Sequence, residues 1–294
     1  MSTSARSFPL RSLPPRLRVY AAAARRRRVT ATDPYRPRHT INVAKRTLMP
    51  GTLYRSAEGV ALRIDPADGF QVSMILGMWQ REVVALLRRF VGAGTTVVDA
   101  GAHMGYITLL AARRVGPGGQ VHAFECDPRL VDRLEEHVAL NGASWVRVNP
   151  VALLDHSGDE VPFHLPSQLG WSSTRGGGEG DVVTVPTVAL DDYLEGRGVE
   201  PESISFVKVD VEGAELDVLR GAQTTLRHAT PAVVVEFLPV RMRELGDEPE
   251  TLFGLMEGLG YRPWMASPRA LRSWRFELVP HDRQTESEIV FLKA

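Results

Sequence analysis

The spacing of apolar residues alternates between a strand-like and a helix-like pattern over most of this chain. Short runs rich in valine, isoleucine and phenylalanine predict strands at residues 96–99, 121–125, 146–148 with 151–153, 205–210 and 232–237. Apolar positions spaced by three or four residues predict helices at 78–91, 106–115, 128–140, 214–226 and 251–259. This alternation favours an α/β domain of the Rossmann-like type, with a mostly parallel sheet covered by helices.

Other parts of the chain follow a different pattern. Residues 160–165 and 182–188 are predicted antiparallel strands joined by a Gly/Ser-rich loop, and 276–279 and 288–292 are predicted closing strands. Residues 1–39 combine many arginines and prolines with a single acid, which is typical of an unstructured basic tail. We therefore expect three parts: the tail (1–39), an N-terminal extension that could cap a substrate (40–77) and a main domain (78–294).

Composition narrows the classes of partner and location. Lys plus Arg and Asp plus Glu are both 35, so the formal net charge is +0 and nucleic-acid binding is not expected. The lone Cys126 cannot form an intrachain disulfide, which suits the cytoplasm. No apolar run reaches about 18 residues, so no membrane span is expected. The arginines at 25–28 could anchor the tail to acidic partners or a membrane surface, or could simply be solvated.

The strongest local motif is a glycine turn between the predicted strand 96–99 and the helix that follows. Gly101 allows a tight turn, and Gly105 allows close packing at the helix start. The spacing is not the G-x-G-x-x-G of a pyrophosphate-binding loop, and Asp99 ends the strand. An acid suits a positively charged ligand such as S-adenosylmethionine (SAM) better than a diphosphate. Glu125, at the end of the next strand, is placed to accept hydrogen bonds from ribose hydroxyls.

Carboxylates also follow two later strands of the predicted sheet. Asp210 and Glu236 are expected at the same sheet edge as the glycine turn, where they could supply a general base or bind Mg²⁺. Glu212 and Glu215 follow Asp210 closely and could act in the site or only cap the next helix. Lys208 could neutralise these acids or extend to solvent.

Histidines are the other candidates for a base. His103 lies in the glycine turn and is the strongest of them. The remaining candidates are His122, His156, His164 and His281. No pair of histidines has a metal-binding spacing.

Three segments together resemble the FkbM-type methyltransferases: 98–106 (VDAGAHMGY), 122–128 (HAFECDP) and 206–215 (FVKVDVEGAE) followed by VLRGA. Residues 187–191 (TVALD) match a further family segment. The family usually has Asn at the position of His103, Glu at that of Gln80 and often Pro at that of Cys126.

The resemblance implies a SAM-dependent methyltransferase with a mostly parallel seven-stranded sheet, helices on both faces and an inserted antiparallel hairpin. It implies methyl transfer to a hydroxyl oxygen of a sugar or secondary metabolite. The expected cofactor residues are Asp99, Gly101, His103, Gly105, Glu125, Cys126 and Ala152. The expected substrate contacts are Trp171, Ser172, Ser173 and Glu212, and the expected catalytic residues are Asp210, Glu236 and His103, with Asp210 and Glu236 as the option for Mg²⁺.

Two other functions are compatible with the residue pattern. A nicotinamide-dependent oxidoreductase could share the fold, but the glycine spacing disfavours it. A non-catalytic module could bind a partner through the basic tail, and the departures at His103 and Gln80 are its only support. The sequence leaves the oligomeric state open, with a homodimer as one option.

Overall fold

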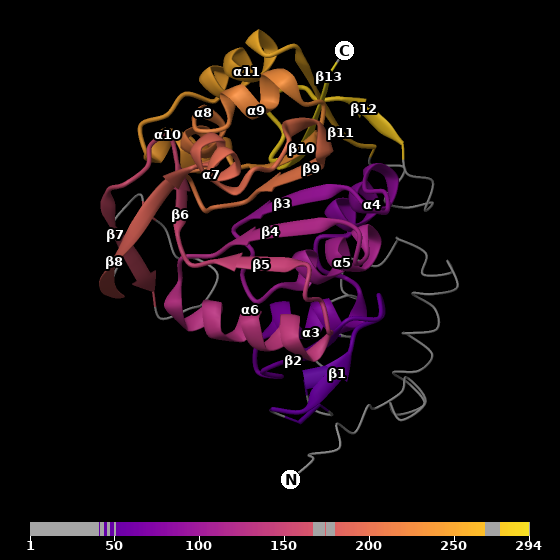
Figure 1. Cartoon of the computed structure of the whole chain (residues 1–294). Helices are drawn as coiled ribbons and strands as arrows, with labels where there is room; N and C mark the ends of the chain where they lie inside the picture. The colour runs from indigo at the N-terminus through magenta and orange to yellow at the C-terminus, as the bar shows by residue number, and fades with distance from the viewer. Residues whose placement is uncertain are drawn as a thin grey trace.

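The computed structural model describes residues 41, 44, 45, 48, 49, 51–166, 174, 180–267 and 277–293, and within them one large mixed sheet dominates (Figure 1). Across the sheet the strands are β12 (Leu278–Pro280), β11 (Tyr261–Ala266), β13 (Ser287–Lys293), β10 (Ala232–Phe237), β9 (Ile204–Val209), β3 (Thr96–Ala100), β4 (Gln120–Phe124) and β5 (Val146–Asn149). The strands from β10 to β5 pair in parallel, and β13, β11 and β12 add antiparallel pairs. The expected α/β fold is confirmed, with eight strands where seven were expected.

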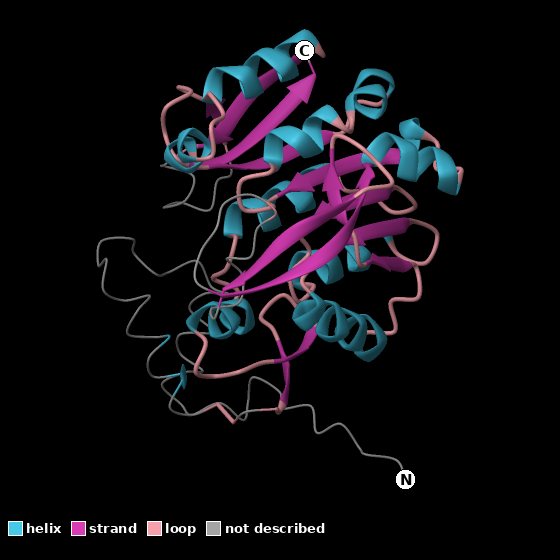
Figure 2. Ribbon diagram, turned by 90° about the vertical axis from the view of Figure 1, so that its left-hand side faces the viewer, coloured by secondary structure: helices cyan, strands magenta, loops and turns pink. Residues whose placement is uncertain are grey.

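Helices pack on both faces of this sheet, as Figure 2 shows. One layer contains α3 (Gly69–Leu76), α4 (Arg81–Phe90), α5 (Tyr106–Val115) and α6 (Pro128–Leu140). The other contains α7 (Leu190–Arg197), α8 (Glu215–Arg220), α9 (Gln223–His228), α10 (Pro239–Glu244) and α11 (Pro249–Gly258). Adjacent side chains of β3 point to opposite faces of the sheet: Val97 packs in the hydrophobic cluster on one face and Val98 in the cluster on the other. Continuous apolar strands are therefore required here, because both faces are covered.

A smaller sheet extends from the edge of the domain. It contains β6 (Ala152–Leu154), β8 (Gly180–Ala189) and β7 (Glu160–Pro166), in that order. β7 and β8 form the predicted antiparallel hairpin, and β6 pairs in parallel with β8. Residues 152–154 thus do not continue the strand at 146–149, but start this second sheet.

Several boundaries differ from the sequence prediction for identifiable reasons. The helix expected from residue 78 begins at Arg81, because Gln80 adopts a left-handed conformation with φ of 40°. The helix expected over 214–226 breaks at Gly221, where a Cβ would lie 2.1 Å from the carbonyl oxygen of Leu154. Residues 71–76 of α3 are all buried, so this helix has no exposed polar face. The spacing of apolar residues in the sequence therefore did not predict a helix there.

The N-terminal extension is part of the same hydrophobic core as the main domain. It contributes α3 and the hairpin β1 (Leu53–Arg55) and β2 (Ala61–Arg63), whose apolar side chains pack with those of α4 to α6. Asn141, at the end of α6, accepts the backbone N–H of Ala61 at 2.8 Å and donates to its carbonyl oxygen at 2.8 Å. The expected basic tail lies outside the described residues. No helix within the described ranges could cross a membrane.

We expect Asn141→Ala to destabilise the protein by about 1–3 kcal/mol, because it removes the partner of both polar groups of Ala61. Urea unfolding would give the free energy, and amide hydrogen exchange would show earlier opening of residues 53–63. Glu135→Ala, at an exposed position of the same helix, is the control and should change neither quantity appreciably. Equal effects of the two substitutions would contradict a docking role for Asn141.

Candidate active site

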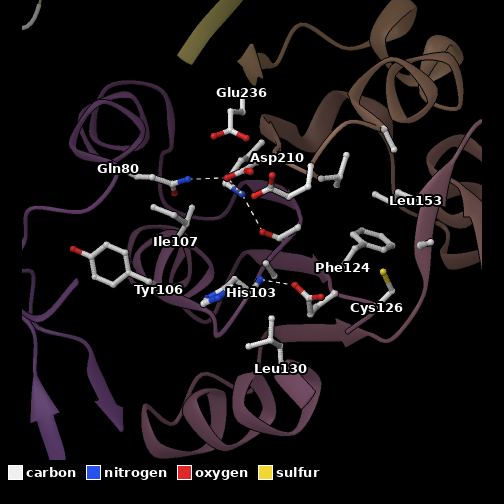
Figure 3. A pocket seen from close by; sticks show the side chains of 18 of the residues that line it. Gln80, His103, Tyr106, Ile107, Phe124, Cys126, Leu130, Leu153, Asp210 and Glu236 are labelled. Atoms are coloured by element: carbon white, nitrogen blue, oxygen red, sulfur yellow. Dashed lines mark hydrogen bonds and ion pairs between the residues drawn. The ribbon is translucent and has the colours of Figure 1, made fainter. Parts of the chain in front are cut away.

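A cavity of about 360 Å³ opens at the carboxyl ends of the central parallel strands (Figure 3). Residues after β3, β4, β9 and β10 line the cavity, and so do residues between 68 and 80, which come from the end of the extension and the start of the main domain. This is the sheet edge at which open α/β folds bind ligands, and the volume is ordinary for a small-molecule site. The cavity therefore gathers six of the polar residues that the sequence singled out: His103, Glu125, Lys208, Asp210, Glu212 and Glu236.

The glycine turn after β3 is shaped by its neighbours. Gly101 has φ of +74°, and a Cβ there would lie only 1.8 Å from the carbonyl oxygen of Asp210. Gly105 has φ of +91°, and a Cβ there would lie 2.5 Å from Cδ1 of Leu134 on α6. Gly101 lines the cavity, whereas Gly105 does not. Gly105 therefore packs against α6, and its role at the cofactor stays a prediction.

His103 continues this turn in a left-handed conformation, with φ of 52°. Its backbone N–H donates to Oε2 of Glu125 at 2.7 Å, and its side chain lines the cavity (Figure 3). Burial lowers the pKa of His103, so the ring is neutral near pH 7. Its buried Nδ1 has no hydrogen-bond partner among the described residues, which leaves it available to a ligand.

Glu125 is held by two backbone donors. Its Oε2 accepts from His103, and its Oε1 accepts from the backbone N–H of Asp127 at 2.8 Å. Burial raises the pKa of Glu125 to about 7 despite these bonds. Each carboxylate oxygen can accept a further hydrogen bond, so the group can bind two adjacent hydroxyls.

The end of the cavity beyond Glu125 is apolar. Phe124, Cys126, Leu130 and Leu153 surround it in Figure 3, and Ala152 also lines it. Burial raises the pKa of the Cys126 thiol, which keeps it protonated and unreactive. This end suits a flat, weakly polar group such as a purine base.

Away from the apolar end of the cavity, the ammonium group of Lys208 lies between two carboxylates, those of Asp99 and Asp210. Its Nζ lies 3.1 Å from Oδ2 of Asp210, 3.4 Å from Oδ1 of Asp99 and 3.0 Å from the carbonyl oxygen of Gly101. Burial alone would lower the pKa of Lys208, but the two carboxylates raise it above its ordinary value. Lys208 is 3% exposed, so it neutralises the acids and does not extend to solvent.

Asp99 lies below the cavity and does not line it. It is fully buried, with Oδ2 accepting from the hydroxyl of Thr108 at 2.6 Å. Because Lys208 lies between Asp99 and the cavity-lining Asp210, Asp99 helps to position that lysine. The role of Asp99 at the cofactor stays a prediction.

The carboxylate of Asp210 has three side-chain partners. Nε2 of Gln80 donates to its Oδ2 at 2.7 Å, and Lys208 and Glu236 are its other partners (Figure 3). Burial opposes ionisation, but these partners hold the pKa of Asp210 below its usual value. Burial, followed by the charge of Asp210, raises the pKa of Glu236 to about 10. At neutral pH Asp210 is thus ionised and Glu236 carries a proton.

The loop after Asp210 is closed by Glu215. Its Oε1 accepts the backbone N–H groups of Val211 and Gly213, each at 3.1 Å, so Glu215 stabilises the loop and does not line the cavity. Glu212 does line the cavity, in a left-handed conformation with φ of 57°. Burial and the charge of Asp210 raise the pKa of Glu212 to about 8.

Three of these carboxylates could together bind a cation. Asp210, Glu212 and Glu236 each offer an oxygen within 4.8 Å of the others. Oxygen ligands of this kind suit Mg²⁺. A shared proton between Asp210 and Glu236 explains the same proximity without a metal, so the Mg²⁺ site stays a prediction.

The structure adds residues that the sequence pattern did not identify as functional. Phe70, Tyr106 and Gln80 all line the cavity, and Gln80 was visible only as a departure from the family pattern. The expected substrate residues Trp171, Ser172 and Ser173 lie outside the described residues, although Thr174 lines the cavity. The remaining candidate histidines, His122, His156, His164 and His281, do not line it.

Comparison with known proteins is consistent with this geometry. A family model described as "Methyltransferase FkbM domain" matches residues 99–263. Hexuronic acid methyltransferase AglP of Haloferax volcanii is 27% identical over 175 residues, covering 57% of this chain and 70% of that protein. 2-O-methyltransferase NoeI of Sinorhizobium fredii is 29% identical over 167 residues, covering 50% of this chain and 63% of that protein.

The matches therefore span about two thirds of the length of these relatives. Among solved structures, methyltransferase FkbM from Methylobacillus flagellatus aligns over 87% of this chain and 59% of that chain. Its TM-score is 0.41 at 13% sequence identity.

We expect Gly101→Ala to destabilise the protein by about 2 kcal/mol or more, because the added Cβ would overlap the carbonyl oxygen of Asp210. Gly118→Ala is the matched control, since a Cβ at Gly118 has no neighbour within 4 Å. That control should remain within about 1 kcal/mol of wild type. Thermal and urea unfolding of both variants would test this, and a wild-type stability for Gly101→Ala would refute the close approach.

Proposed function

This chain belongs to the FkbM methyltransferase family, and we propose that it transfers a methyl group from SAM to a hydroxyl oxygen of a sugar or secondary metabolite. The observation that carries the proposal is that Glu125, held by the backbone N–H groups of His103 and Asp127, lines the same cavity as a set of apolar residues and the carboxylates of Asp210 and Glu236. The names of the relatives, a hexuronic acid methyltransferase and a 2-O-methyltransferase, support a sugar hydroxyl as the acceptor.

The residues present fit SAM. Glu125 can bind the two ribose hydroxyls, and the apolar end near Phe124 and Leu153 can enclose the adenine. His103 and the turn at Gly101 face the space that remains for the methionine part. When bound, SAM supplies a methyl group on a positively charged sulfur.

The protein's own task is to orient the acceptor hydroxyl and take its proton. Gln80 and Lys208 both donate to Oδ2 of Asp210, which holds this oxygen in place. We assign Asp210 to orienting the hydroxyl, and the Asp210–Glu236 pair to receiving the proton. His103 is the second candidate base, because its neutral ring has an unpartnered Nδ1 in the cavity.

A divalent cation is the alternative source of assistance. Bound by Asp210, Glu212 and Glu236, it would lower the pKa of the acceptor hydroxyl. Chelation distinguishes the two options, since a metal-independent enzyme keeps its rate in EDTA.

The proposal is tested by methyl transfer from tritium-labelled SAM to a panel of sugars and hydroxylated metabolites. Radioactivity on an acceptor oxygen would support it. The absence of SAM binding by calorimetry would contradict it, whatever the acceptor.

We expect the affinity for S-adenosylhomocysteine (SAH) to rise with pH through about 7 and then level off. Ribose hydroxyls donate to the ionised carboxylate, and Glu125 is largely protonated below its raised pKa. Glu125→Gln should weaken binding about 10- to 100-fold and remove this pH dependence. Calorimetry between pH 5.5 and 8.5 is the measurement, with Glu250→Gln on exposed surface as the control. A wild-type pH profile in Glu125→Gln would remove Glu125 from the site.

Asp210→Asn should reduce kcat by at least about 100-fold while SAH affinity changes less than about threefold. The substitution keeps the shape of the side chain, but removes the charge that orients the hydroxyl and receives its proton. Single-turnover methyl transfer and calorimetry are the measurements. Asp132→Asn, at an exposed position of α6, is the isosteric control. Unchanged turnover would exclude Asp210 from the catalytic residues.

A further inference from the structure

Helix α6 contacts the glycine turn (residues 101–105) at two adjacent positions. Leu134 packs against Gly105, where a Cβ would lie 2.5 Å from Cδ1 of Leu134. His137 follows three residues later on the same face of α6, and its Nδ1 lies 2.7 Å from the carbonyl oxygen of Met104. The turn is therefore shaped by α6 as well as by the strand that precedes it.

His137 is fully buried and has a hydrogen-bond partner at each ring nitrogen. Its Nε2 accepts the backbone N–H of Arg63 on β2 at 3.0 Å. A carbonyl oxygen only accepts and a backbone N–H only donates, so Nδ1 carries the proton and Nε2 carries none. Burial lowers the pKa of His137, which keeps the ring neutral near pH 7. Arg63 thus selects the tautomer that can bind Met104.

The carbonyl group of Met104 depends on this bond. Met104 is fully buried, and within the described part of the chain no backbone N–H donates to its oxygen. The helical bonds of α5 begin one residue later, where Leu109 donates to the carbonyl oxygen of Gly105 at 2.9 Å. A buried carbonyl without a donor is costly, so loss of the His137 bond would favour a turn in which this group reaches water.

The beginning of the glycine turn is held by other bonds. The backbone N–H groups of residues 101 and 102 donate to the carbonyl oxygen of Phe124 at 3.0 and 2.9 Å. His103 lies between these bonds and Met104, in a left-handed conformation, and its N–H donates to Oε2 of Glu125. A residue other than glycine keeps this conformation only where its surroundings enforce it. The direction of the His103 N–H therefore depends on both ends of the turn.

We propose that His137 is a positioning residue for the cofactor: its Nδ1–H holds the Met104 carbonyl and so keeps the glycine turn in the conformation that brings His103 to Glu125. This deepens the proposed function and rests on it, because Glu125 is assigned there to the ribose hydroxyls of SAM. His137 does not line the cavity, so it acts through the turn. The N-terminal extension takes part as well, since Arg63 fixes the tautomer.

The bond affects cofactor affinity in addition to stability. Without it, the free protein can relax the turn so that the Met104 carbonyl is hydrated. Cofactor binding must then restore the original turn and leave that carbonyl unpaired. The apparent affinity is reduced by the fraction of molecules in which the turn is still formed.

Two amide substitutions separate the roles of the two ring nitrogens. The amide of Asn lies close to the place of Nδ1 and can still donate to Met104, whereas the amide of Gln lies close to the place of Nε2 and reaches Arg63 instead. We expect His137→Gln to raise the dissociation constant for SAH at least about 10-fold, and His137→Asn to change it less than about threefold. Calorimetry at a temperature at which each variant is folded is the measurement.

Asn141→Ala is the control for a loosened extension. It removes the bonds that dock Ala61 on α6, one turn beyond His137, but leaves the Met104 carbonyl paired. We expect it to lower the free energy of unfolding while SAH affinity stays within about threefold of wild type. A wild-type affinity in His137→Gln would overturn the proposal. Equal losses of affinity in His137→Gln and in either of the other two variants would also overturn it.

The wild-type protein provides an independent test if the His137 variants fail to fold. The nitrogen chemical shifts of the His137 ring should be those of a neutral ring with its proton on Nδ1, and this proton should exchange with solvent more slowly when SAH is bound. A proton on Nε2, or an exchange rate that SAH does not change, would overturn the proposal.

SAH binding by the wild-type protein separates this inference from the proposed function. If wild type and His137→Gln bind SAH equally well, His137 has only a structural role and the methyltransferase proposal stands. If wild type does not bind SAH, the proposed function itself fails.

Discussion

The buried ammonium of Lys208 is the interaction on which the site depends. It lies between Asp99 and Asp210, at the point where the carboxyl ends of β3 and β9 converge. Burying either carboxylate alone would be costly, and the lysine compensates both. The same point demands glycine at residue 101, because Asp210 leaves no room for a side chain there. Charge compensation and backbone packing thus fix the glycine turn and the proposed catalytic acid together.

Around this centre the cavity separates two chemical environments. Its lining includes an apolar group, with Phe124, Leu130 and Leu153, and a carboxylate group, with Asp210 and Glu236, while Glu125 is held by two backbone donors. Such a division suits a ligand with a flat, weakly polar base at one end and a positive charge at the other.

Residues that precede the large sheet form part of the cavity lining. Phe70, Trp79 and Gln80 all come from residues that precede the first strand of the large sheet. They are held in place because the extension shares the core of α4 to α6 and is docked through Asn141. One part of the cavity lining therefore comes from a segment with weak sequence patterning, while the rest comes from the motifs that follow it.

The sequence by itself determined the order of the main strands and helices and the family, and it predicted Glu125 and Asp210 as site residues, both of which line the cavity. These features are local: apolar periodicity over 5 to 13 residues defines the elements, and short motifs follow strand ends. Only the tertiary structure decided what Lys208, Gln80 and Asp99 do. Gln80 meets Asp210 across 130 residues of sequence, and no local pattern encodes such a contact. The all-round burial of α3 and the break at Gly221 likewise arise from neighbours distant in sequence, so periodicity could not reveal them.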